Sequence, residues 1–340
     1  MTSTPRAATA ALKITATVCL GLDVSKAKID ACLLRVGYRP QHRQFDNSPA
    51  GLKALQAWCQ RLGHAAPLTV LEATGRYSDL AATLLHAAGF SVHLANPRRI
   101  KDYARSLGRR NKTDRLDAEL IATFGLSRSL PAWVPPAPEL LRLRSLLRRL
   151  SDLQALRQAD HNRLDGATAS PVVTKSLTRI VRVLDQEIAR FEALIVAHVQ
   201  AHPTLQADVD RLCHIEGIGT RTAWWLCAEL PRHLPNPRAA AAWLGVTPRL
   251  RQSGSSLRHT APVGADGNRH LRKVLFMAAL AARRCNPRLR AFAERLLANH
   301  KPRLAVIIAV LHKLLKISFA LLQRQSSYQP DHRPVSFSQK

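Results

Sequence analysis

The segments CLGLDVSK (residues 19–26) and LTVLEATG (residues 68–75) decide the fold that the sequence predicts. Each begins as a short apolar run of the kind that forms a buried strand. Each run also ends in an acidic residue, Asp23 in the first segment and Glu72 in the second. These two acids, at the ends of two apolar strands, are the first candidates for a functional site.

Around these segments the N-terminal third of the chain alternates strands and helices in the order β-β-β-α-β-α-β-α. This order joins an antiparallel ribbon to parallel crossovers, and it is the order of a ribonuclease-H-like fold over residues 15–130. In that fold strands one and four lie side by side in the middle of the sheet, which would bring Asp23 and Glu72 together. The expected elements are strands at residues 15–24, 28–36, 41–46, 68–73 and 91–96, and helices at 48–61, at 77–88 and from 96 onward.

A third segment, NKTDRLDAELIA (residues 111–122), adds Asp114 and Asp117. Because these acids are three residues apart, they lie on one face of a helix. Like charges gathered in one place are unfavourable unless a cation binds them. We therefore expect the four acids to bind Mg²⁺, with two ions about 4 Å apart as in two-metal phosphoryl transfer. The alternative is that Asp23 only terminates a strand and that the helical pair is solvated.

The charge balance predicts a polyanionic partner. The 340 residues include 51 lysines and arginines against 23 acids, a net charge of +28. Such an excess is typical of nucleic-acid-binding proteins, the alternatives being a ribosomal-type or membrane-surface basic protein. A hydrophobic content of 46% argues against a disordered basic tail. The six scattered cysteines suit a reducing cytoplasm, and the apolar segment 304–322 is expected to be a buried helix rather than a membrane span.

Prolines in PAWVPPAP (residues 131–138) predict a stiff linker between domains. After it, apolar residues at heptad spacing predict an antiparallel coiled-coil hairpin over residues 139–204, which would act as a spacer or an oligomerisation arm. Residues 205–325 are expected to form a helical domain. The two ends, residues 1–14 and 326–340, are expected to be flexible and disordered.

Within the helical domain, LCHIEGIGTRTAWWLCAEL (residues 212–230) places Gly217 and Gly219 between two helical stretches. This is the form of a helix-hairpin-helix, in which glycines let the N–H groups at the start of the next helix approach a phosphate. The alternative is an ordinary turn with glycine as a helix cap, because G-x-G alone is a weak signal.

A serine-containing loop follows, with Ser253, Ser255 and Ser256 beside Gly254. A serine loop surrounded by arginines suits either passive phosphate binding or a serine nucleophile held against a phosphate. The residues alone favour the passive role. The candidate phosphate-binding residues around the loop are Arg249, Arg251, Arg258, Arg269, Arg272 and Lys273.

Five blocks of the chain together resemble the DEDD-type insertion-sequence transposases, which are relatives of the Piv DNA invertase. Some members of that family are guided by a structured bridge RNA. The resemblance covers roughly residues 18–320 and implies a RuvC-like N-terminal domain joined across a coiled coil to a C-terminal transposase domain. The blocks, in the family's order, are GLDVSK, LEATGRY, NPRRIKDYARSLGRRNKTDRLDAELIA, IEGIG, and LGVTPRLRQSG with GNRHLRK.

The resemblance also implies residue roles. Ser253, directly before Gly254, matches the serine that attacks a DNA phosphate and becomes covalently linked to it, with Ser255 and Ser256 as alternatives. One position departs from the family: relatives often have a basic residue where this chain has Asp266, so a phosphate contact is expected to be either missing or replaced by Arg258 or Arg269. The four acids match the family's motif, with Asp23 first, Glu72 second, and Asp114 and Asp117 as the closing pair.

The expected function is therefore that of an insertion-sequence transposase, which cleaves and rejoins DNA with Mg²⁺ and a serine nucleophile. Expected partners are donor and target DNA, a guide RNA, and further copies of the chain in a dimer or tetramer, in the bacterial cytoplasm at the nucleoid and without a membrane. Two alternatives remain. One is a RuvC-like endonuclease that uses water, and the other is a non-catalytic basic scaffold that binds RNA or DNA.

Overall fold

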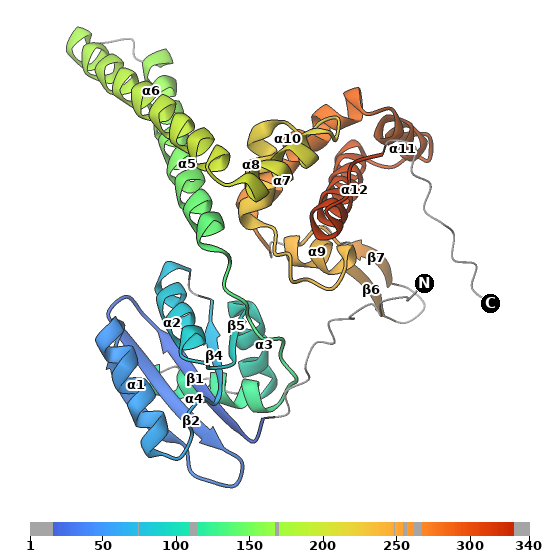
Figure 1. Cartoon of the computed structure of the whole chain (residues 1–340). Helices are drawn as coiled ribbons and strands as arrows, with labels where there is room; N and C mark the ends of the chain where they lie inside the picture. The colour runs from blue at the N-terminus through green and yellow to red at the C-terminus, as the bar shows by residue number, and fades with distance from the viewer. Residues whose placement is uncertain are drawn as a thin grey trace, which may run out of the picture. The chain divides into compact units, whose positions relative to one another are not determined.

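The chain divides at Pro135 into two units, Met1–Pro135 and Pro136–Lys340 (Figure 1). The computed structural model describes residues 16–73, 75–108, 114–166, 170–247, 249–253, 257–261 and 267–329. The predicted flexible N-terminus, residues 1–14, lies outside them, as does the predicted tail beyond residue 329. Within the described part of that tail, the Tyr328 hydroxyl accepts a hydrogen bond of 3.1 Å from Asn286 Nδ2.

The first unit is built on a five-stranded mixed sheet in the order β3-β2-β1-β4-β5. Strand β1 pairs antiparallel with β2 and parallel with β4, so the predicted adjacency of strands one and four is confirmed. Strands β2 and β3 pair antiparallel, and β4 and β5 pair parallel. The strands are β1 (Val18–Val24), β2 (Lys28–Arg35), β3 (Gln41–Asp46), β4 (Leu68–Glu72) and β5 (Val92–Ala95).

Helices cover both faces of this sheet because its central strands are apolar on both sides. On one face, Leu20 and Leu22 of β1 pack with Leu55 of α1 and Leu85 of α2. On the other face, Cys19 of β1 belongs to a second cluster formed with α3 and α4. The helices are α1 (Pro49–Arg61), α2 (Arg76–Ala87), α3 (Pro97–Ser106) and α4 (Asp114–Leu126).

Helix α4 approaches the sheet so closely that glycine is required at the contact. A Cβ atom added to Gly21 of β1 would overlap the carbonyl oxygen of Ala118 and would lie 2.9 Å from the Cα of Ala122. A Cβ added to Gly125 of α4 would overlap the Cys19 side chain of β1 and would lie 2.8 Å from Val70 Cγ2 of β4. Small residues on both sides therefore bring the α4 backbone against β1 and β4.

The second unit is mainly helical, and two of its helices, α5 and α6, lie side by side as a long hairpin (Figure 1). Leu143 and Leu147 of α5 and Ile195 of α6 belong to the same core as the helices that follow them. The base of the hairpin and the helical region after it, which were predicted as separate, thus share one hydrophobic core. The helices are α5 (Pro138–Asp165), α6 (Pro171–Gln200), α7 (Pro203–Cys213), α8 (Thr220–Glu229), α9 (Pro237–Leu244), α10 (Arg269–Cys285), α11 (Pro287–Ala298) and α12 (Arg303–Arg324).

One short pair of strands interrupts the helices of residues 205–325, which were predicted to form a helical domain. Strands β6 (Arg249–Ser253) and β7 (Leu257–Ala261) pair antiparallel as a two-stranded hairpin between α9 and α10. The sequences RLRQS and LRHTA contain few apolar residues, so they lack the regular alternation by which a half-buried strand is recognised.

Helix α12 has the length and hydropathy of a membrane-spanning helix, and it is the one described helix that does. In the structure, Val310, Leu314 and Phe319 of α12 are buried in the core of the second unit. A core helix of a folded domain meets the same criteria, and the packing of α12 agrees with the predicted buried helix.

We expect Gly21→Ala to destabilise the first unit by about 3 kcal/mol or more, because the added methyl group meets helix backbone that cannot move aside alone. Gly166→Ala is the matched control, since Gly166 has φ −93° and a Cβ there meets its nearest atom at 3.6 Å. The measurement is thermal unfolding followed by circular dichroism. Equal melting temperatures for the two variants would contradict the close approach of α4.

Candidate active site

The strand acids Asp23 and Glu72 lie at the same edge of the sheet. In the parallel pair of β1 and β4, Leu22 is opposite Leu71. Asp23 and Glu72 follow these residues and therefore occupy the next positions along adjacent strands, which lie about 4.8 Å apart. The sheet thus brings together the two acids that the sequence predicted to meet.

Both acids also lie on the face that α4 covers. The Cys19 and Val70 side chains meet Gly125 of α4, so they mark this face on β1 and β4. Because side chains alternate along a strand, Asp23 and Glu72 share the face of Cys19 and Val70 respectively. Both acids are half-buried.

The direction of α4 places its first turn at the same edge. Gly21 contacts Ala118 and Ala122, whereas Cys19, nearer the start of β1, contacts Gly125. Helix α4 therefore runs antiparallel to β1 and begins where β1 ends. Asp117 lies in its first turn and is half-buried. Asp114 is the first residue of the helix, and its side chain lies outside the described part of the structure.

The donor set suits a hard divalent cation, since carboxylate oxygens are the preferred ligands of Mg²⁺. Among the side chains that the structure describes, no three acidic, histidine or cysteine groups converge closely enough to hold a metal ion. Asp23, Glu72 and Asp117 each already interact with neighbouring groups. A complete ligand set would therefore also need Asp114.

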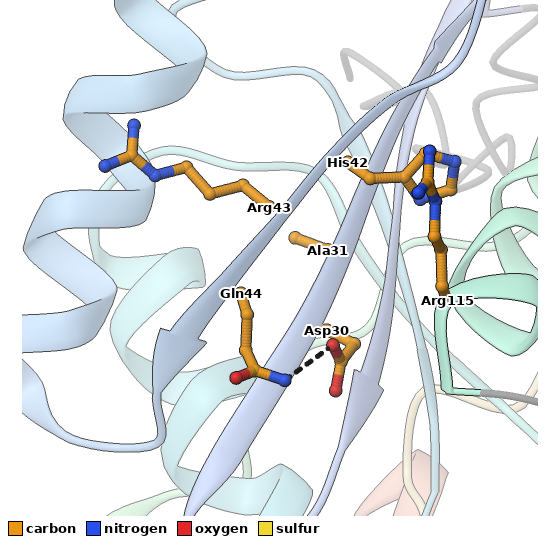
Figure 2. A pocket seen from close by; sticks show the side chains of 6 residues that line it. All are labelled: Asp30, Ala31, His42, Arg43, Gln44 and Arg115. Carbon is orange, nitrogen blue, oxygen red and sulfur yellow. Dashed lines mark hydrogen bonds between the residues drawn. The ribbon is translucent and has the colours of Figure 1, made fainter.

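A pocket of about 180 Å³ lies where β2 and β3 meet Arg115 of α4 (Figure 2). Asp30 of β2 is directly opposite Asp23 in the strand register and accepts a hydrogen bond of 2.9 Å from Gln44 Nε2. Sequence reasoning did not single out Asp30. The antiparallel pairing expected for the first two strands is the signal that would have placed Asp30 next to Asp23. The lining residues are Asp30, Ala31, His42, Arg43, Gln44 and Arg115.

One wall of this pocket contains a histidine–carboxylate contact between distant parts of the chain. His42 Nε2 of β3 lies 3.4 Å from Glu119 Oε2 of α4. Burial lowers the pKa of His42, and the positive charge of Arg115 lowers it further, with Glu119 opposing both effects. The lowered pKa favours the neutral form of the imidazole. The Glu119 side chain is only 23% exposed.

In the second unit, Ser253 belongs to the β6–β7 hairpin. Ser253 is the last residue of β6 and pairs with Leu257. Ser255 and Ser256 lie outside the described residues. Arg249, Arg251 and Ser253 occupy alternate positions along β6, and Arg258 of β7 is paired with Gln252. The predicted arginines therefore lie in the same hairpin as Ser253.

The start of α10 holds the remaining predicted cations. Asn268 caps this helix, its Oδ1 accepting a hydrogen bond of 3.0 Å from the Leu271 backbone N–H. Arg269 and Lys273 are exposed in the first turns, and Arg272 is half-buried and already has an interaction partner. Basic side chains at a helix N-terminus can contact an anion together with the free N–H groups of the first turn.

The two glycines of the predicted helix-hairpin-helix have different environments. Gly217 has φ 101°, and a Cβ there would lie 2.5 Å from the Cα of Ala282 in α10. Packing within the unit therefore explains glycine at this position. Gly219 precedes the first residue of α8, and a Cβ there would meet no atom within 4 Å. Gly219 is thus the position where a phosphate has room to approach the backbone.

Two family models match this chain in separate regions. A model of DEDD transposases of the IS110 type matches residues 20–168. A second model, described as "Transposase IS116/IS110/IS902 family", matches residues 209–294. The first includes all four acids, and the second includes the β6–β7 hairpin.

Curated relatives agree with these matches. The "Pilin gene-inverting protein" of Moraxella bovis is 28% identical over 91% of this chain and 97% of its own length. The "Probable family 20 transposase" of Pseudomonas aeruginosa is 28% identical over 77% of this chain and 86% of its own. An "Insertion element IS110 uncharacterized 43.6 kDa protein" of Streptomyces coelicolor is 28% identical over 48% of this chain and 40% of its own.

The acids at one sheet edge, the serine hairpin and these matches agree: the chain belongs to the IS116/IS110/IS902 family of transposases, enzymes that act on DNA.

Proposed function

We propose that this transposase cleaves and rejoins DNA strands in a Mg²⁺-dependent reaction with Ser253 as the nucleophile. The observation that carries the proposal is the placement of Asp23 and Glu72 on adjacent strand ends, under the first turn of α4 with Asp117. Half-buried acids at the edge of a sheet can reach a phosphate in solvent while the fold holds their backbone in place.

Asp23, Glu72, Asp114 and Asp117 would hold the metal. Bound there, Mg²⁺ would supply Lewis-acid stabilisation of the charge that develops on the phosphate. The four acids orient the DNA strand through this site. They do not themselves form a bond to it.

Ser253 would form the covalent link to DNA. As its Oγ bonds to phosphorus, the hydroxyl loses its proton and the bond from phosphorus to a deoxyribose oxygen breaks. A hydroxyl of the new strand partner then attacks the same phosphorus, the bond to Ser253 breaks, and the serine regains a proton. The position of Ser253 at the tip end of β6, with Arg249 and Arg251 at alternate positions before it, supports this role.

The acids and Ser253 belong to different units of the chain, so both units must meet at one phosphate. We propose that active centres are composed between copies of the chain in a dimer or tetramer. The α5–α6 hairpin is the proposed coiled-coil arm. Exposed apolar side chains on α6, among them Val173, Ile180 and Val183, support an arm that contacts another chain.

Nucleic acid would bind over the basic surfaces of both units. The net charge of +28 suits donor and target DNA together with a structured guide RNA, whose backbone would be recognised by shape. Gly219, Arg269 and Lys273 are proposed phosphate contacts in the second unit, with Arg272 beside them. The protein would therefore act in the bacterial cytoplasm, at the nucleoid.

Asp23→Asn should lower strand cleavage by about a thousandfold, the effect of losing roughly 4 kcal/mol of transition-state stabilisation. Asp102→Asn is the matched control, because Asp102 is an exposed acid of α3 that pairs with Arg98 and Arg105. The measurement is cleavage of labelled DNA over a Mg²⁺ titration. Equal rates for both variants and the wild type would exclude the acidic edge as the metal site.

Ser253→Ala should abolish the covalent protein–DNA product, because alanine has no hydroxyl to attack phosphorus. The product is detected as a labelled band that survives denaturing electrophoresis. Ser255→Ala and Ser256→Ala should retain it. Cleavage by Ser253→Ala at the normal rate would favour a water-using endonuclease instead, since the acidic edge lies wholly in the first unit.

The guide is tested by purifying the full chain from cells and sequencing the nucleic acid bound to it. We expect a discrete RNA encoded beside the gene, enriched over total RNA and released as salt is raised. Recovery of DNA or of random cellular RNA alone would contradict a guide and would favour direct readout of DNA by the protein.

A further inference from the structure

The segments that flank the serine hairpin in the chain, the end of α9 and the residues before α10, are in tight contact and are called its base here. Along the chain, helix α9 ends at Leu244, shortly before β6. Gly267 follows β7 and comes just before α10. A Cβ added to Gly267 would lie 2.5 Å from the Leu244 carbonyl carbon and 2.8 Å from the Trp243 carbonyl oxygen, and its φ of 96° also favours glycine. The segments that lead into and out of the hairpin therefore lie against each other at this base.

Asn268, the next residue, ties this base to helix α8. Its side chain forms two hydrogen bonds in different directions. Oδ1 caps α10, and Nδ2 donates to Glu229 Oε2 at 2.9 Å. His270 adds a second link between α10 and α8. Its ring is stacked on that of Trp225 in α8, with 5.8 Å between the ring centroids.

Glu229 in turn ties α8 to the arm. Its side chain is only 5% exposed, and Arg148 Nη2 of α5 donates to its Oε1 at 3.1 Å. Arg144 Nε lies 3.5 Å from Oε2, and Arg144 Nη2 donates to the Ala228 carbonyl oxygen at 2.7 Å. The two oxygens of one carboxylate thus connect α5 to the cap of α10.

We propose that Glu229 is a positioning residue for the serine hairpin, holding its base, through Asn268, in a fixed place relative to helix α5 of the arm. This inference rests on the proposed function, because the hydrogen bonds of Glu229 can affect the reaction in this way only if Ser253 is the nucleophile. A buried ion-paired carboxylate is weak evidence for stability but fixes geometry, because its hydrogen bonds are directional. A displacement of about 1 Å at a reacting group can cost a hundredfold in rate.

Three variants test the link without removing the helix cap. Asn268→Asp keeps a good N-cap but sets a second carboxylate against Glu229. Glu229→Gln removes the charge and keeps the shape. The double variant Glu229→Gln/Asn268→Asp lets the new amide donate to the new carboxylate and conserves the total charge of the cluster. Asn236→Asp is the matched control, because Asn236 caps α9 through the Ala239 N–H in an exposed position.

The experiment uses the full chain and a labelled DNA duplex that it cleaves. Two quantities are compared: the single-turnover rate of the covalent serine–DNA product, and the affinity for the duplex from fluorescence anisotropy. We expect each single variant to lower the rate by about a hundredfold, with affinity unchanged. The double variant should recover most of the rate, and Asn236→Asp should match the wild type.

Recovery in the double variant is the readout that a merely structural role would not produce, and it remains informative if a single variant folds poorly. A double variant as slow as the singles, or single variants as fast as Asn236→Asp, would overturn the inference. The proposed function is tested apart from it. If Ser253→Ala still forms the covalent product, the nucleophile is wrong, whatever the Glu229 variants do.

Discussion

The contact between Gly21 of β1 and the backbone of α4 fixes the geometry on which the acidic edge depends. Only glycine at this position lets Ala118 and Ala122 come so near the sheet. Gly125 makes the corresponding contact one turn further along the helix. Because α4 contacts β1 at two points, both its distance from the sheet and its direction relative to β1 are fixed. Its first turn, with Asp117, therefore begins at the ends of β1 and β4, and a larger residue at 21 would move the helical acid away from the strand acids.

The second unit positions its candidate nucleophile by a different means. An isolated two-stranded hairpin has little packing of its own. The residues that flank this hairpin are held by the contact of Gly267 with Leu244 and by the hydrogen bond of Asn268 to Glu229. Close packing is suited to setting the distance between a helix and a sheet. A polar network is suited to fixing the orientation of a small element, because each hydrogen bond has a preferred direction.

The features that could be predicted from the sequence are those fixed by local pattern and chain order. The apolar runs ending in Asp23 and Glu72 and the order of strands and helices were enough to place β1 beside β4. The contact of His42 with Glu119 could not be predicted, because it joins residues far apart in the chain across a sheet edge. Nor could the different roles of Gly217 and Gly219, since only tertiary packing against Ala282 separates them.

Burial distinguishes two groups of acids in the described parts of this chain. Glu229 and Asp208 of the second unit are each about 95% buried and each is paired with two arginines. No phosphate can reach such a carboxylate, and removing its charge would leave two guanidinium groups without their partner. The strand and helix acids of the first unit are half-buried at the open edge of a sheet. Accessibility rather than charge therefore separates the buried, ion-paired carboxylates of the second unit from the acids of the first unit that a metal ion could reach.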